Sequence, residues 1–490
     1  MSDQPTDKSD ERQSANWDIS NAPKNYVSLV LTQGGSAFFS FASVWLITKF
    51  LGSEGYGSVV AVIAASQIAQ VVINWTSIAV VRFGVDEFIE TGKIARVFWL
   101  RLLILLSNTV LAFLTVKLWF PPLAGWLNLT PDAFWLVIAH FIAMPLWIHL
   151  QYSFQALKMP RLQGGLMTVE RILIFSGLLI FLAINQFNAF NVLICYVVAP
   201  SLMTIGSFLY LRRYIFARFP IDAQFVKKIV YYSAPLLPFA LLGYFSSGYL
   251  DAIFVSRFLS TRDLGIYSVA TQINGIALQL PTLANSLLIP LFISLQREDS
   301  VQKMERYFRH ILPALTLLWS FFCLALGCAG YFLIPLVLGA EFAGSVLPLW
   351  ILATASVISL PILIGYSALS HATSATYITM FAAIFSGAAN VACNFLLIPR
   401  YGMTGCAWAT AAACLVSAAA YYLFLHRSNR IPLSWTLQAM LPMIAGAAVF
   451  SLNGNLFVSL PIYVIIGILV VYLHGNSFRE TLYFYRNLKK

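Results

Sequence analysis

The chain has 490 residues, of which 59% are hydrophobic and only 10% are charged, and its formal net charge is +11. Soluble proteins carry about 25% charged residues, so this composition excludes a soluble globular fold. The basic residues are spread along the chain instead of forming one patch, which argues against nucleic-acid binding.

The apolar residues fall into blocks that can cross a membrane, since roughly 30 Å of hydrocarbon needs about 20 helical residues. We therefore predict an all-α polytopic membrane protein with about 14 transmembrane helices. Their expected positions are 26–50, 57–80, 99–120, 134–157, 170–187, 191–211, 229–256, 265–294, 310–330, 345–370, 374–397, 402–425, 436–452 and 457–474.

Residues 1–25 mix polar, acidic and basic side chains and contain no apolar block, which predicts a disordered tail instead of a signal peptide. If this tail is cytoplasmic, most of the 30 Lys and Arg residues fall in cytoplasmic segments, as the positive-inside rule requires. We expect both termini in the cytoplasm.

Motifs for bound groups are missing from the sequence. It has no GxxxxGK[ST], GxSxG or GxGxxG motif, no paired CxxC and no HExxH, so we expect no cofactor and no metal. Asp86, Glu87 and Glu90 form the one acidic cluster, on a short juxtamembrane segment where a solvated face is the simpler interpretation. The sequence therefore favours a protein that is not an enzyme.

An internal repeat divides the chain. FLGSEGYGSVV at 50–60 aligns with FLSTRDLGIYSVA at 258–270, and the alignment places Gly57 against Gly265. Transporters are often built from such repeats, with the substrate path between them.

We accordingly predict two six-helix bundles that are joined by a cytoplasmic linker. The bundles are 26–211 and 229–425, and the linker is 212–228. Residues 426–490 supply two extra helices and a cytoplasmic tail.

Four stretches resemble the polysaccharide flippases of the multidrug/oligosaccharidyl-lipid/polysaccharide exporter superfamily. They are the run from IVYYSAPLLPF to YSVATQI at 229–273, KFLGSEGYGSVVAV at 49–62, LVLGAEFAGSVLPLWIL at 336–352 and NFLLIPRYGMTGCAWATAAA at 394–413. The resemblance covers about 26–425. The family often has Asp-Arg on its seventh helix, whereas this chain has Asp251 followed by Ala252.

The resemblance implies a monomeric protein of the bacterial inner membrane. It would move an undecaprenyl-pyrophosphate-linked oligosaccharide to the outer leaflet, by alternating access, for O-antigen or exopolysaccharide synthesis. Membrane lipids and the polymerase and ligase of the same pathway are the expected partners. Two alternatives stay open: an ion-coupled multidrug exporter of the same superfamily, and a membrane polymerase or ligase of lipid-linked sugars.

Asp251 is a carboxylate in an otherwise apolar stretch. It lies about 35 Å along a helix that starts near Lys228, which would place it at the outer interface, near Arg257 and Arg262. Ser247 precedes it by one turn, however, and a polar face of this kind favours a wet cavity. We expect Ser247 and Asp251 to line a cavity.

Amide side chains recur on two further predicted helices. Gln67, Gln70 and Asn74 share a face of the second helix, and Gln272 and Gln279 share a face of the eighth. The resemblance places both helices around a central cavity, where amides could bind sugar hydroxyls. Interhelical hydrogen bonds are the other interpretation.

A pyrophosphate needs cations, and arginine presents a fixed fork of donors. Arg82 and Arg171 lie at the predicted cytoplasmic ends of two helices, and Arg101 and Arg257 are further candidates. Positive-inside anchoring would also explain these residues. Glu170, beside Arg171, is expected either to pair with another helix or to relay protons.

Overall fold

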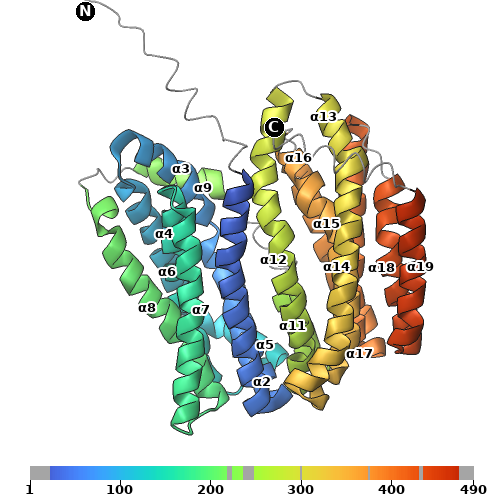
Figure 1. Ribbon diagram of the computed structural model, residues 1–490. Coiled ribbons are helices and arrows are strands. Elements are labelled where there is room, and N and C mark those ends of the chain that lie inside the picture. The colour runs from blue at the N-terminus through green and yellow to red at the C-terminus, as the bar shows by residue number, and fades with distance from the viewer. Residues whose placement is uncertain are drawn as a thin grey trace, which may run out of the picture.

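The computed structural model describes residues 22–217, 223–234, 248–297, 301–372, 376–429 and 434–473. Within these ranges, ten helices combine the length and the hydropathy needed for a membrane span. The predicted all-helical, multi-span membrane fold is thus confirmed. Figure 1 shows the helices standing side by side, with the earlier helices in blue and green on one side and the later helices in yellow and red on the other.

The N-terminal half of the described chain contains eight helices. They are α2 (Ala22–Asn74), α3 (Ser77–Thr91), α4 (Ala95–Leu114), α5 (Val116–Leu127), α6 (Ala133–Ala156), α7 (Pro160–Ala183), α8 (Ala189–Ile215) and α9 (Ala223–Ser233).

The C-terminal half begins at α11, and π-helical or 3-10 turns interrupt it. Its elements are α11 (Gly248–Phe258), α12 (Thr261–Arg297), α13 (Val301–Arg306), η3 (Tyr307–Ile311), α14 (Leu312–Leu333), η4 (Ile334–Leu338), η5 (Ala340–Ser345), α15 (Val346–Pro361), η6 (Ile362–Tyr366), α16 (Ser367–Ala372), α17 (Thr376–Asn429), α18 (Ser434–Asn453) and α19 (Leu456–Leu473).

Two long helices each take in two of the predicted spans, although α2 ends at Asn74, before the predicted end of span 57–80. The backbone of α2 leaves the helical region at Gly52 (φ 66°), and that of α17 does so at Gly402 (φ 58°). Glycine adopts positive φ at little cost, so each position lets the chain turn between two helical segments. Of the other predicted spans, 265–294 lies within α12, and 229–256 falls partly outside the described residues.

The two halves meet where α2 crosses α12. A Cβ atom added to Gly57 would lie 1.9 Å from the carbonyl oxygen of Thr261, and one added to Gly265 would lie 1.8 Å from that of Ser53. The two glycines that the internal repeat aligns therefore face each other. Only residues without a side chain allow the two backbones to come this close.

Hydrogen bonds tie the bend of α2 to the second half at the same end of the molecule. The Ser53 hydroxyl donates to Glu341 Oε2 (3.0 Å), and Trp45 Nε1 donates to the carbonyl oxygen of Val337 (3.1 Å). Glu341 belongs to η5 and Val337 to η4. This end of the α2–α12 contact is thus held by both close packing and polar contacts.

Gly57→Ala tests the crossing. The added methyl group collides with backbone, so we expect the substitution to cost about 1–3 kcal/mol and to lower the melting temperature in detergent. Gly206→Ala is the matched control, because nothing lies within 4 Å of a Cβ at that helical position. Equal melting temperatures for the two variants would contradict the crossing.

Candidate functional site

A polar cavity of about 420 Å³ lies between the two halves of the molecule. Residues of α2, α6, α7 and α8 line it from the first half, and residues of α11 and α12 line it from the second. Ser36, Ser40 and Ser43 lie on one face of α2, since they follow each other at helical spacing, and all three face the cavity. This wall of the cavity thus offers hydroxyl groups.

Five of the residues predicted from the sequence line this cavity: Gln67 on α2, Glu170 and Arg171 on α7, and Gln272 and Gln279 on α12. They come from both halves of the chain. The structure therefore brings together amide, carboxylate and guanidinium groups that lie up to 212 residues apart in the sequence, as the numbers of Gln67 and Gln279 show.

Arg171 is a cation that pairs with no carboxylate in the described part of the chain. Its neighbour Glu170 is buried and accepts a hydrogen bond from Trp147 Nε1 of α6 (2.8 Å). Glu170 thus bonds to another helix, but through an indole and not through an ion pair. The Glu170 carboxylate lines the same cavity but forms no ion pair with Arg171, so the guanidinium donors are available to an anionic guest.

Four predicted residues lie outside the cavity lining: Arg82, Gln70, Asn74 and Asp251. Arg82 pairs with Asp86 one turn along α3 (2.6 Å), and its side chain is 54% exposed. Gln70 is buried behind the cavity wall, with its Nε2 3.4 Å from Ser66 Oγ and 3.5 Å from His140 Nδ1. Ser247 falls outside the described residues.

Asn74 also turns away from the cavity. Its Oδ1 accepts a hydrogen bond from Arg101 Nη2 of α4 (2.9 Å), and Arg101 Nη2 also reaches the hydroxyl of Ser77 (3.1 Å). Arg101 is 0% exposed, so it is not a headgroup ligand at the surface. Because Asn74 ends α2 and Ser77 begins α3, Arg101 holds the break between these helices.

Asn74→Ala tests this clamp. Loss of a hydrogen bond to a charged group costs about 1.5–3 kcal/mol, so we expect the variant to melt at a lower temperature than the wild type. Asn74→Asp keeps an acceptor for Arg101 and should melt near the wild-type temperature. An unchanged melting temperature for Asn74→Ala would show that Arg101 does not depend on this bond.

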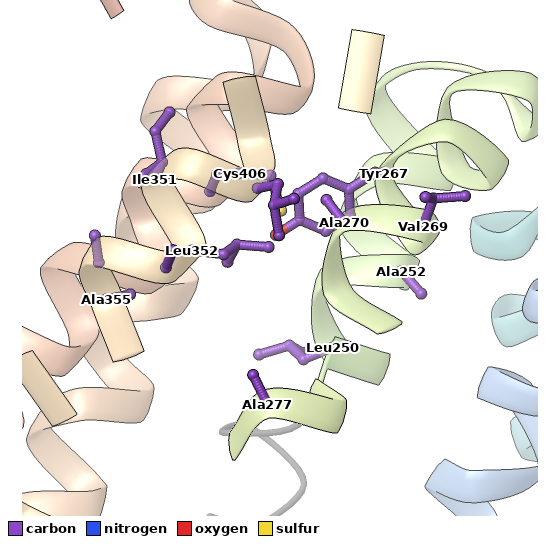
Figure 2. Close-up of a cluster of buried hydrophobic side chains, with 14 of the residues drawn as sticks. Leu250, Ala252, Tyr267, Val269, Ala270, Ala277, Ile351, Leu352, Ala355 and Cys406 are labelled. Carbon is purple, nitrogen blue, oxygen red and sulfur yellow. The ribbon is translucent and has the colours of Figure 1, made fainter. Parts of the chain in front are cut away.

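Asp251 does not line the cavity, contrary to expectation, and does not pair with Arg257 or Arg262. It is 4% exposed and accepts hydrogen bonds from the Tyr267 hydroxyl (2.9 Å) and from Thr410 Oγ1 (2.8 Å). Since Thr410 belongs to α17, the carboxylate faces the interior of the C-terminal half. In Figure 2, Tyr267 points from α12 toward Cys406 of α17.

The sequence analysis missed several lining residues. His140 of α6 lines the cavity, as do Tyr196 of α8 and Tyr249 of α11. Histidine was considered only as a zinc ligand, and tyrosine is common in membrane spans. The serine pattern on α2 was the available signal, because small hydroxyl residues recur there at helical spacing.

Comparison with known proteins places the chain in a family. Residues 22–296 match the family model described as "Polysaccharide biosynthesis protein". The chain belongs to this family. A comparison of the whole chain with curated proteins gives no match.

Solved structures share its fold. The lipid II flippase MurJ, in an inward closed conformation, superposes with a TM-score of 0.65 at 16% identity, covering 95% of this chain and 100% of that chain. An inward-facing multidrug resistance MATE transporter of the MOP superfamily gives 0.59 at 14% identity, covering 84% and 99%. A mutant of the Vibrio cholerae MATE transporter VcmN gives 0.58 at 14% identity, covering 86% and 99%. The chain thus has the same fold as these transporters.

Proposed function

We propose that this membrane protein is a flippase for an undecaprenyl-pyrophosphate-linked oligosaccharide. It would carry the sugar from the inner to the outer leaflet of the bacterial inner membrane, for O-antigen or exopolysaccharide synthesis. Membership of the polysaccharide biosynthesis family and the polar cavity between the halves support this function.

The unpaired Arg171 is the observation that carries the proposal. A pyrophosphate brings negative charge into the membrane, and a guanidinium offers it two parallel N–H donors. Arg171 lies on the cavity wall among hydroxyl and amide groups that suit sugar hydroxyls. Arg82 is not part of this site, because it is exposed and already paired with Asp86.

An apolar cavity next to the polar one suits the isoprenoid tail. It has a volume of about 490 Å³ and is lined by α2, α12, α14 and η4, with Phe38, Phe41 and Leu326 among its residues. Ile276 and Gln279 line both cavities. A lipid-linked substrate could therefore keep its tail in an apolar environment while its headgroup lies beside Arg171.

Transport would proceed by alternating access. Two six-helix bundles, 26–211 and 229–425, would rock about their contact, and the Gly57–Gly265 crossing would close one end. The chain would have fourteen spans, a linker at 212–228, and an added helix pair with a tail at 426–490. Both termini would then lie in the cytoplasm. The protein would act as a monomer and pass its product to a polymerase and ligase.

A multidrug exporter is the second function that the fold allows. The Glu170 carboxylate of the cavity already accepts a hydrogen bond from Trp147, whereas the Arg171 guanidinium offers donors that suit a pyrophosphate and not a cationic drug. Arg171 therefore favours the flippase.

Arg171→Ala tests the proposal. Losing a hydrogen-bonded charge contact of about 1.5–3 kcal/mol should lower surface polysaccharide at least about tenfold at equal protein level. Arg171→Lys keeps the charge but loses the fork, so we expect partial activity. Arg309→Ala is the matched control, because Arg309 is 57% exposed, lies outside the cavity lining and pairs with Glu305 near the end of α13. Normal polysaccharide in Arg171→Ala cells would contradict the proposed headgroup site.

A further inference from the structure

His140 is held at the cavity wall by a small polar cluster. It is 3% exposed, lies on α6 and faces the cavity that contains Arg171. Its Nδ1 is hydrogen-bonded to the Ser66 hydroxyl of α2. Gln70 lies one turn further along α2, with its amide nitrogen 3.5 Å from the same ring atom. The ring is thus fixed from behind by two side chains of one helix.

The cluster engages Nδ1 of the ring. The Ser66 hydroxyl donates to the carbonyl oxygen of Ile63 (3.0 Å), so its oxygen can accept from Nδ1, while the amide nitrogen of Gln70 can donate to the same atom. Both tautomers of a neutral imidazole fit these contacts, and in each of them Nε2 can form one hydrogen bond, as donor or as acceptor.

The other ring nitrogen, Nε2, opens to the cavity. No described residue forms a hydrogen bond with Nε2, and this atom is not fully buried. His149, nine positions further along α6, is different, because both of its ring nitrogens are buried without partners. Nε2 is therefore the ring atom of His140 that can form a hydrogen bond with whatever occupies the cavity.

We propose that His140 recognises the sugar of the lipid-linked substrate, with its Nε2 forming a hydrogen bond with a hydroxyl group of the sugar attached to the pyrophosphate. This inference rests on the proposed flippase function. A neutral ring with one nitrogen left for the cavity suits a sugar hydroxyl, which can donate or accept, whereas Arg171 supplies the charge that a pyrophosphate needs. Ser66 and Gln70 are positioning residues, because they act only through the orientation of the ring.

Two probes separate the sugar contact from the pyrophosphate contact. They are undecaprenyl pyrophosphate and undecaprenyl-pyrophosphoryl-N-acetylglucosamine, each titrated by native mass spectrometry against the purified full chain in nanodiscs. We expect the wild type to bind the sugar-bearing probe more tightly, by up to about tenfold, as one buried hydrogen bond allows.

His140→Ala should abolish this preference and leave the affinity for undecaprenyl pyrophosphate unchanged. Arg171→Ala should weaken the binding of both probes. His140→Gln offers both a donor and an acceptor, so we expect part of the preference to return, and its melting temperature reports whether the fold is intact. Ser66→Ala should reduce the preference, because it removes the hydrogen bond that fixes the orientation of the His140 ring.

Three results would overturn the inference. One is a sugar preference that survives in His140→Ala, and another is a wild type that binds both probes equally. In both cases Arg171 would still bind the pyrophosphate, so the proposed flippase function would stand. The third is a wild type that binds neither probe, which would contradict both the proposed function and the sugar contact.

Discussion

The close backbone crossing of α2 and α12 is the constraint on which the rest of the structure depends. At Gly57 and Gly265 a single Cβ atom on either helix would overlap a carbonyl oxygen of the other. The two helices therefore touch at one end, and the same two helices line a polar cavity further along their length. Because the glycines occupy equivalent positions in an internal repeat, the contact joins the two halves in a nearly symmetric way. Every property proposed for the cavity depends on this arrangement.

Polar groups inside a membrane protein must find partners within the protein, because lipid offers none. Arg101 meets Asn74 and Ser77, and Asp251 meets Tyr267 and Thr410. These contacts hold helices together and do not face the cavity. Arg171 differs, because it lies at the cavity wall without a carboxylate partner in the described chain. Its charge is therefore available to a substrate.

The helical membrane fold was predictable, because long apolar blocks leave few alternatives, whereas the close contact of Gly57 with Gly265 emerged from the structure. Gln67, Gln272 and Gln279 were found because polar residues at helical spacing share a face. Asp251 and Asn74 fit the same pattern but face other helices. The rotation of a helix is set by all of its neighbours, so a stripe of residues on one helix does not identify the helix it meets. His140 was missed because its role depends on Ser66 of another helix.

The measurement that tests the central claim most directly is the leaflet location of the lipid-linked repeat unit in cells depleted of this protein. A membrane-impermeant, sugar-modifying probe applied to spheroplasts and to inverted vesicles reports it. The flippase account predicts that the repeat unit accumulates on the cytoplasmic face and returns to the outer face when the wild-type protein is restored. A repeat unit that still reaches the outer face, while only its polymerisation or ligation fails, would contradict the account.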